Sequence, residues 1–157
     1  MRSSLIIPRA FTLLILLSSL FSLNANGGTL DGYLFDTRPV LLFTTSTDST
    51  KYKEQVAALS EYECEFYTRD LEVLKVFNER ESIIDGTALT TEEVSFLKDE
   101  LEVGPYNDLL VLVGKDGRVK LRAQMPFKPS DLIRLVDSMP MRQVEKMTRP
   151  QLSCHSA

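Results

Sequence analysis

Apolar residues in this chain gather into short runs and helical stripes that alternate along the sequence. Val40–Phe43 is apolar at consecutive positions, and Leu71–Phe77 has apolar residues on both faces, which is typical of strands in a buried sheet. Between them, apolar residues recur at three- and four-residue spacing from Tyr52 to Phe66, which predicts one amphipathic helix. The first part of the chain is therefore predicted to form a strand, a helix and a second strand.

The next segments continue the alternation. Thr90 and Glu93 have the spacing of a capping box, so a second helix is predicted to begin there. Leu109–Val113 is a third apolar strand, and the turn sequence "GKDG" joins it to a fourth strand at Val119–Gln124. The third and fourth strands are therefore predicted to form an antiparallel hairpin.

A last helix is predicted to begin at Pro129 and to end before Pro140, followed by polar sequence. The resulting order is strand, helix, strand, helix, strand, strand, helix. Because crossover connections within one sheet are right-handed, we expect both strand–helix–strand units to give parallel pairs. The predicted fold class is α/β: a thioredoxin-like three-layer sandwich, in which a four-stranded mixed sheet with an antiparallel edge hairpin has helices on both faces.

The N-terminal residues have the layout of a secretory signal peptide. Arg2 and Arg9 precede an apolar run from Ala10 to Leu23, which is shorter than the about 20 residues that a membrane span needs. We predict cleavage after Ala25 and a periplasmic or secreted protein, the alternative being an uncleaved membrane anchor. The expected organisation is a signal peptide (1–25), a linker (26–37), a thioredoxin-like domain (38–147) and a polar tail (148–157).

Charge and cysteine content restrict the partners. The chain has 18 basic and 22 acidic residues, and loss of the two early arginines leaves 16 − 22 = −6. An acidic domain with scattered cations favours neither nucleic acid nor, after signal cleavage, a membrane surface. The oxidising space reached by export allows disulfides to persist. Cys64 and Cys154 are predicted either to form a disulfide or to leave Cys64 free near the far end of the first helix.

The loop between the first strand and the first helix has no thiol. A thioredoxin-like redox enzyme places a reactive cysteine at the start of that helix, where the helix dipole stabilises the thiolate. Here the position lies between Ser46 and Lys51, and only hydroxyl, acidic and basic residues occupy it. The only histidine is His155, so no base for a hydroxyl nucleophile and no common metal-ligand spacing is present. We therefore predict no catalytic residue, no metal and no cofactor.

Several polar residues could instead form an anion site. Free N–H groups at the start of the first helix, with Lys51 beside them, favour a bound anion. The hydroxyls of Thr45, Ser46 and Thr47 would donate hydrogen bonds. Lys120 alternates with apolar residues and is predicted to share one face of its strand with Arg122. The alternative interpretation is that these residues only cap a helix and protect an edge strand.

Three segments resemble a known family. "RPVLLFTTSTDSTKYKEQVAAL", "LLVLVGKDGRVKLR" and "LVDSMPMRQVEKM" are similar to domain-of-unknown-function family 4174, from about Arg38 to Met147. That domain also occurs in the sushi-repeat and DRO/URB/Equarin group of secreted vertebrate proteins. The resemblance implies a fold close to peroxiredoxins, generally without their catalytic cysteines. It also implies that Arg122, on a later strand, approaches the start of the first helix.

These observations predict an exported thioredoxin-like domain that acts as a non-catalytic binding module. Its partner would be a protein or a small anion, recognised at the start of the first helix. The alternative is an atypical thiol-disulfide oxidoreductase or peroxiredoxin-like enzyme that uses Cys64.

Overall fold

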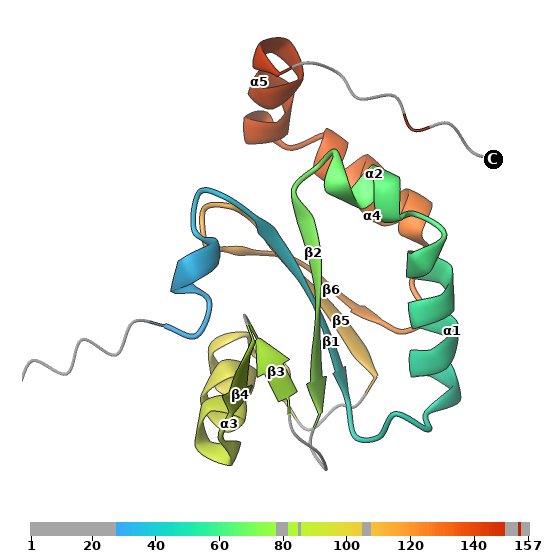
Figure 1. The fold of residues 1–157 in the computed structure, drawn as a ribbon, viewed down its shortest axis with the longest axis vertical. Coiled ribbons are helices and arrows are strands. Elements are labelled where there is room, and N and C mark those ends of the chain that lie inside the picture. Colours follow the sequence, from blue (N-terminus) through green and yellow to red (C-terminus); the bar gives the residue numbers. More distant parts are fainter. Residues whose placement is uncertain (1–27, 78–81, 85, 105–107, 150–153, 155–157) are drawn as a thin grey trace, which may run out of the picture.

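A four-stranded sheet with helices on both faces forms the centre of the computed structural model, which describes residues 28–77, 82–84, 86–104, 108–149 and 154 (Figure 1). The predicted fold class is confirmed. The sheet strands are β1 (Arg38–Thr44), β2 (Leu71–Phe77), β5 (Leu109–Val113) and β6 (Val119–Gln124), and β3 (Ser82–Ile84) pairs with β4 (Thr87–Leu89) in a separate ribbon. The helices are η1 (Asp31–Tyr33), α1 (Thr50–Ser60), α2 (Glu63–Tyr67), α3 (Thr91–Glu100), α4 (Pro129–Asp137) and α5 (Pro140–Thr148).

The strand order is β2-β1-β5-β6, and only one neighbouring pair is parallel. β1 and β2 run parallel, as predicted, but β1 and β5 are antiparallel, so the second predicted parallel pair is wrong. Thr44 lies opposite Phe77, and Phe43 lies opposite Leu109. The β3–β4 hairpin and α3 therefore return the chain to the end of the sheet at which β2 finishes. The right-handed crossover rule applies to connections between parallel strands of one sheet, and this connection joins β2 to β5, which run antiparallel to each other.

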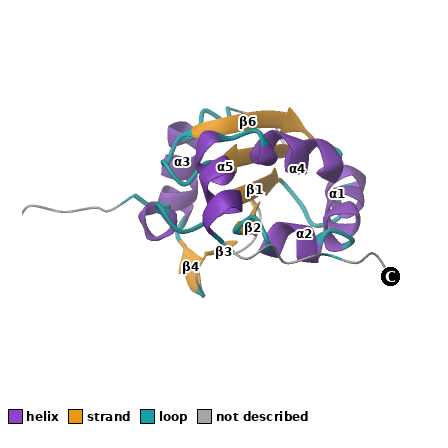
Figure 2. Ribbon diagram, turned by 90° about the horizontal axis from the view of Figure 1, so that it is seen from above, coloured by secondary structure: helices purple, strands orange, loops and turns teal. Residues whose placement is uncertain are grey.

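Two apolar cores lie on opposite faces of the sheet. Leu41 and Val111 point toward α3, where they pack with Leu97. On the other face, Leu42 packs with residues of α1 and α4, including Leu132. Figure 2 shows α1 and α3 on opposite sides of the strands. Apolar residues on both faces explain why the sequence of β1 and β5 reads as unbroken hydrophobic runs.

The first helix is interrupted. Instead of one helix from Tyr52 to Phe66, the structure has α1 ending at Ser60 and the five-residue α2 beginning at Glu63. Ser49 caps α1 by accepting a hydrogen bond from the Tyr52 N–H. The predicted capping box of α3, between Thr90 and Glu93, is confirmed.

The chain beyond Pro140 forms a helix where the sequence predicted polar, irregular chain. α4 ends at Asp137, and Pro140 is then the first residue of α5. Proline ends a preceding helix, but its fixed φ angle and missing N–H also suit the first turn of the next one. Figure 1 shows α5 at one end of the molecule, beyond the sheet.

The segment predicted as a linker includes η1, and Tyr33 of this element lies in the core with 4% of its surface exposed. Gly117 of the β5–β6 turn has a φ of +72°, and a Cβ there would lie 2.8 Å from a Leu34 methyl carbon. The predicted signal peptide lies outside the described residues. Within the described part of the chain, no helix combines the length and the apolar character that a membrane crossing requires.

Candidate functional site

The loop that follows β1 is closed by a carboxylate of the protein itself. Asp108, just before β5, accepts hydrogen bonds at one oxygen from the hydroxyls of Thr44 and Ser49, both 2.8 Å long. The Asp108 carbonyl accepts a further bond from the Met125 N–H at 2.8 Å. Asp108 has a φ of 60°, a left-handed conformation that aspartate tolerates better than most residues. An internal carboxylate therefore binds two hydroxyls at the ends of the loop in which an anion site had been predicted.

Within the part of the chain that the structure describes, the other loop residues predicted to bind an anion make local hydrogen bonds or none. The Ser46 hydroxyl accepts a hydrogen bond from the Asp48 N–H, as in an ordinary turn. Thr45 has a buried hydroxyl that lacks a hydrogen-bond partner in the described part of the chain. Thr47 is half-buried and Lys51 is exposed. These positions supply a turn and a helix start.

Lys120 and Arg122 do not join the loop, so the predicted convergence on the first helix is wrong. Arg122 lies opposite Val111, on the face that α3 covers, while α1 covers the other face. Its Nε donates to the Leu101 carbonyl at 2.7 Å, and its Nη2 lies 3.1 Å from the Glu102 carboxylate. Because Arg122 and the start of α1 lie on opposite faces of the sheet, the Arg122 side chain does not approach that helix end.

A bulge separates the two cations that had been predicted to share one face. Leu121 lies opposite Leu112 and Val119 lies opposite Val113, so Lys120 has no partner in the register. The extra residue breaks the two-residue alternation on which the prediction rested. Lys120 instead lines a cavity of about 430 Å³ beside α4 and α5, where its amino group is 2.7 Å from Asp116.

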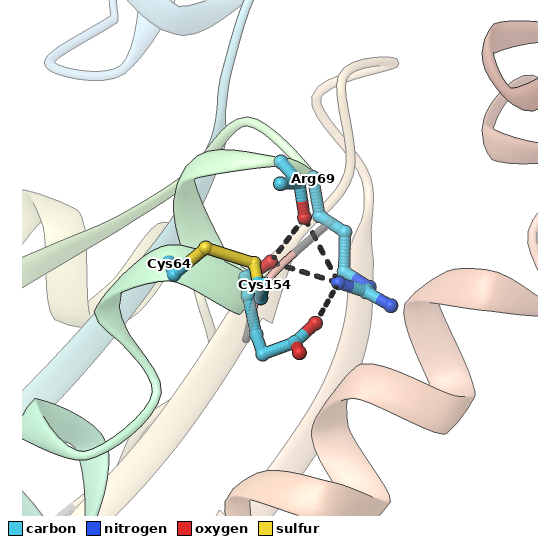
Figure 3. The surroundings of a disulfide bond; sticks show 5 residues. Cys64, Arg69 and Cys154 are labelled. Carbon is cyan, nitrogen blue, oxygen red and sulfur yellow. Dashed lines mark hydrogen bonds and ion pairs between the residues drawn. A yellow bond between two sulfur atoms is a disulfide. The ribbon is translucent and has the colours of Figure 1, made fainter. Parts of the chain in front are cut away.

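The two cysteines form a disulfide, which selects one of the two predicted alternatives. Cys64 of α2 is joined to Cys154, 90 residues later, with the Cα atoms 5.8 Å apart (Figure 3). Cys64 was expected near the end of a long helix, but the break after α1 makes it the second residue of α2. The disulfide attaches Cys154, beyond the end of α5, to α2.

Arg69 lies in the surroundings of the disulfide and connects α2 to α4 (Figure 3). Its Nη1 is 2.6 Å from the Glu65 carboxylate, and its Nη2 is 2.8 Å from Asp137. Burial raises the pKa of Asp137, but hydrogen bonds and charge from Arg69, with a bond from Arg142, outweigh that effect and lower the pKa overall. Arg69 therefore holds the end of α4 against α2 through an ion pair.

A buried group of three charged residues holds α5 against the sheet. We call Arg38, Lys115 and Glu145 the α5 clamp. Arg38, at the start of β1, makes two bonds of 3.2 and 2.9 Å to the Glu145 carboxylate, and Lys115 lies 3.0 Å from it. Burial raises the pKa of Glu145, but the two cations outweigh it and lower the pKa below its ordinary value. Lys115 also pairs with Asp70 at 2.6 Å.

α5 turns its charged side inward and its apolar side outward. Its buried residues are Arg142 and Glu145, whereas Met141, Val144 and Met147 are 42%, 54% and 78% exposed. A surface helix normally buries its apolar stripe. We call these three exposed residues the α5 stripe. Because the α5 clamp fixes the helix through its polar side, the α5 stripe remains exposed.

The described residues offer no cluster of three or more His, Cys, Asp or Glu side chains placed to hold a metal ion. The features that stand out are therefore the closed loop after β1, the disulfide and the inverted helix α5.

The fold and its connectivity define a thioredoxin-like domain. The chain belongs to the family described as "Domain of unknown function (DUF4174)", whose model matches residues 29–145.

Solved peroxiredoxin structures share this fold at low sequence identity. A reduced 2-Cys peroxiredoxin from Plasmodium vivax is 16% identical with a TM-score of 0.53, covering 74% of this chain and 84% of its own. Thioredoxin peroxidase I of Plasmodium yoelii is 15% identical with a TM-score of 0.51, covering 76% and 80%. A yeast mitochondrial 1-Cys peroxiredoxin is 14% identical with a TM-score of 0.52, covering 74% and 69%.

Sequence reasoning missed Asp108 and the α5 clamp. Asp108 lies far along the chain from the hydroxyls that it binds, and no local pattern connects them. A signal for α5 was present, since Met141, Val144 and Met147 recur at three-residue spacing after a proline.

Proposed function

We propose that this protein is an exported, non-catalytic thioredoxin-like module that binds a macromolecular partner through its C-terminal helix. The proposal that the protein is non-catalytic rests on the loop before α1, which has no cysteine. The hydroxyls of Thr44 and Ser49 bind Asp108, and both cysteines lie elsewhere, joined to each other.

Thiol chemistry needs a thiolate, and hydroxyls cannot replace it at this position. A serine or threonine hydroxyl becomes a nucleophile only beside a base that removes its proton. Asp108 contacts the hydroxyls of Thr44 and Ser49, but the Ser49 oxygen also accepts the Tyr52 N–H that starts α1. A hydroxyl with this role is a helix cap, so the arrangement supports a structural function for the loop.

The inverted helix supports a binding role. Three exposed apolar side chains on one face of one helix form a continuous stripe, which is uncommon on the surface of a protein that acts alone. Amphipathic helices often bind grooves through apolar residues at such spacing. The disulfide supports this role, because it attaches the chain that follows α5 to α2.

Enzyme assays on the protein without residues 1–25 test the absence of catalysis. Peroxide consumption with a thiol reductant and reduction of insulin disulfides are both measured, with Cys64→Ser as the matched variant. We expect rates equal to the protein-free background for both proteins. Sustained turnover that disappears in Cys64→Ser would refute the non-catalytic function.

Export is supported by the predicted signal peptide and by a disulfide, a bond that persists in oxidising compartments. The test is a fusion of residues 1–27 to a reporter enzyme that is active only after export. We expect reporter activity, which Leu16→Arg should abolish by interrupting the apolar run. An inactive fusion that remains inside the cell would contradict export.

A second function, thiol-disulfide exchange, is favoured by the exposure of Cys64 and its position as the second residue of α2. In this reaction the Cys64 thiolate of the reduced protein attacks a substrate disulfide and forms a mixed disulfide. Cys154 then attacks Cys64, which releases the reduced substrate and restores the internal disulfide. Cys154→Ser would trap the mixed disulfide, and mass spectrometry detects the adduct; its absence with disulfide substrates would exclude this function.

A further inference from the structure

A cavity of about 430 Å³ lies between the end of α4, the start of α5 and the β5–β6 turn. We call it the α4–α5 cavity. Its walls are largely apolar and come from the two helices and the residue that precedes α5: Leu135, Met139, Pro140 and Met141. A cavity of this volume, with apolar walls and a few polar groups, is typical of a site that binds a small molecule.

Two buried cations of the α5 clamp line the same cavity and have N–H groups to spare. Arg38 donates one hydrogen bond to the Arg69 carbonyl and two to the Glu145 carboxylate, although a guanidinium has five N–H groups. The Lys115 amino group contacts Asp70 and Glu145, which accounts for two of its three N–H groups. Both side chains are only 1% exposed, so three buried N–H groups lack an acceptor among the described residues. Because a buried donor without an acceptor is costly, these groups favour an oxygen atom at this end of the cavity.

Lys120 brings a third cation to the cavity. Its amino group is 2.7 Å from Asp116, and its side chain is 30% exposed. A Cβ on Gly114 would lie 2.5 Å from the Lys120 Cε atom, so the glycine leaves room for the lysine side chain beside the turn. One contact leaves two further N–H groups of this amino group for a ligand.

The ion pairs around the cavity leave one positive charge in excess. Among the described residues, the pairs that include the α5 clamp form one connected network of five cations and four carboxylates: Arg38, Arg69, Lys115, Arg142 and Arg149 with Glu65, Asp70, Asp137 and Glu145. The charges of Lys146 and Asp36 also act on this network, and they cancel each other. Lys120 and Asp116 cancel within their own pair. The excess charge favours an anion in the cavity.

We propose that the α4–α5 cavity binds a small carboxylate that carries an apolar chain. One carboxylate supplies the single negative charge that the network lacks, and its two oxygens accept hydrogen bonds from guanidinium and ammonium groups. The apolar chain covers the walls formed by Leu135 and Met139, which a free inorganic anion would leave bare. This inference goes beyond the binding role proposed for α5 and does not depend on it, because the ligand is a small molecule and not a macromolecular partner.

Isothermal titration calorimetry with the disulfide-intact protein tests the proposal. The probe is octanoate. Octylammonium has the same chain with the opposite charge, 1-octanol has the chain without a charge, and acetate has the charge without the chain. We expect one octanoate per protein chain, bound at least about tenfold more tightly than each of the other three compounds. Octanoate that does not bind saturably would overturn the proposal, and so would equal affinity for any of the three.

Two variants test whether octanoate occupies this cavity. Lys120→Gln removes a cation from the lining, and Met141→Glu adds an acid to the α5 wall, so each should weaken octanoate binding by about tenfold. The two side chains are partly exposed, so both variants should keep the melting temperature of the unmodified chain. Lys53→Gln is the matched control, because Lys53 is an exposed lysine that pairs with Asp48 outside the cavity. If Lys120→Gln or Met141→Glu weakens binding no more than Lys53→Gln does, the proposal is wrong.

Glu145→Gln provides an independent measurement. It removes one carboxylate from the network and raises the excess from one positive charge to two. Octanoate should therefore bind several-fold more tightly to this variant, measured below its melting temperature. An affinity equal to or lower than that of the unmodified chain would refute the argument that the excess charge selects the ligand.

Discussion

Replacing Glu145 by glutamine tests the α5 clamp directly. The substitution keeps the shape of the side chain and removes its charge. Arg38 is 1% exposed at its side chain and loses its carboxylate partner, whereas Lys115 keeps Asp70 at 2.6 Å. The expected loss of stability therefore comes mainly from one uncompensated buried guanidinium.

Removing one partner of a buried ion pair typically costs about 3–5 kcal/mol. Glutamine still offers one carbonyl oxygen to Arg38, so we expect the lower end, about 3 kcal/mol. The control is Asp48→Asn, because its pair with Lys53 is exposed, with 90% of the Asp48 side chain and 60% of the Lys53 side chain accessible. An exposed pair of this kind contributes less than about 1 kcal/mol.

Urea unfolding at neutral pH, with the disulfide intact, measures both free energies of unfolding. A double-mutant cycle with Arg38→Met isolates the pair, and the combined loss should be smaller than the sum by about 2 kcal/mol. A loss below about 1 kcal/mol for Glu145→Gln, with an unchanged urea dependence, would refute the argument that this charge is buried and required.

Three further predictions concern the α5 clamp, the Asp108 carboxylate and the disulfide. Because folding lowers the pKa of Glu145, the contribution of its charge to stability is complete above the ordinary pKa of about 4.3 and is lost as the pH falls through the lower pKa of the folded protein. The difference in free energy of unfolding between the unmodified chain and Glu145→Gln should therefore disappear in acid. A difference that does not change with pH would contradict this prediction. Asp108→Ala removes the acceptor for the Thr44 and Ser49 hydroxyls and should reduce the free energy of unfolding, measured in urea, by about 1–3 kcal/mol. An unchanged free energy of unfolding would show that water replaces the carboxylate without cost. Cys154→Ser opens a covalent loop with a sequence separation of 90 and should lower the free energy of unfolding by up to about 4.6 kcal/mol, the loss of chain entropy that the closed loop imposes on the unfolded chain. A variant as stable as the unmodified protein would mean that the ion pairs alone hold α5 in place.

The central fold was predictable because its strands are buried on both faces. β5 is apolar at every position and β1 is apolar from Val40 to Phe43, and short apolar runs between turn residues are typical of strands that are buried on both faces. The capping box at Thr90 is equally local, since both of its partners lie within one helical turn. These local features were predicted correctly, whereas the break between α1 and α2 was missed although it is local as well.

Features that depend on distant residues, or that invert the usual pattern, were not predictable in this way. α5 buries Arg142 and Glu145 instead of its apolar residues, so the spacing of its three exposed apolar residues was not interpreted as a helix and the segment was predicted as polar sequence. One extra residue at Lys120 rotates it away from the face of Arg122, and nothing in the local sequence marks that bulge. Lys120 and Arg122 had been assigned to one face by alternation alone, and this part of the predicted anion site is wrong for that reason.

The bond between Cys64 and Cys154 converts most of the domain into a covalent ring. A protease that cuts one peptide bond inside this ring produces two fragments that stay attached, so the nicked protein keeps its mass apart from one added water. The ring contains β2, α3, the β5–β6 hairpin and both C-terminal helices, whereas β1 and α1 lie outside it. A single cut before Cys64 leaves an N-terminal fragment with no covalent link to the rest of the chain, whereas the fragments of a single cut inside the ring stay linked until a reductant opens the disulfide.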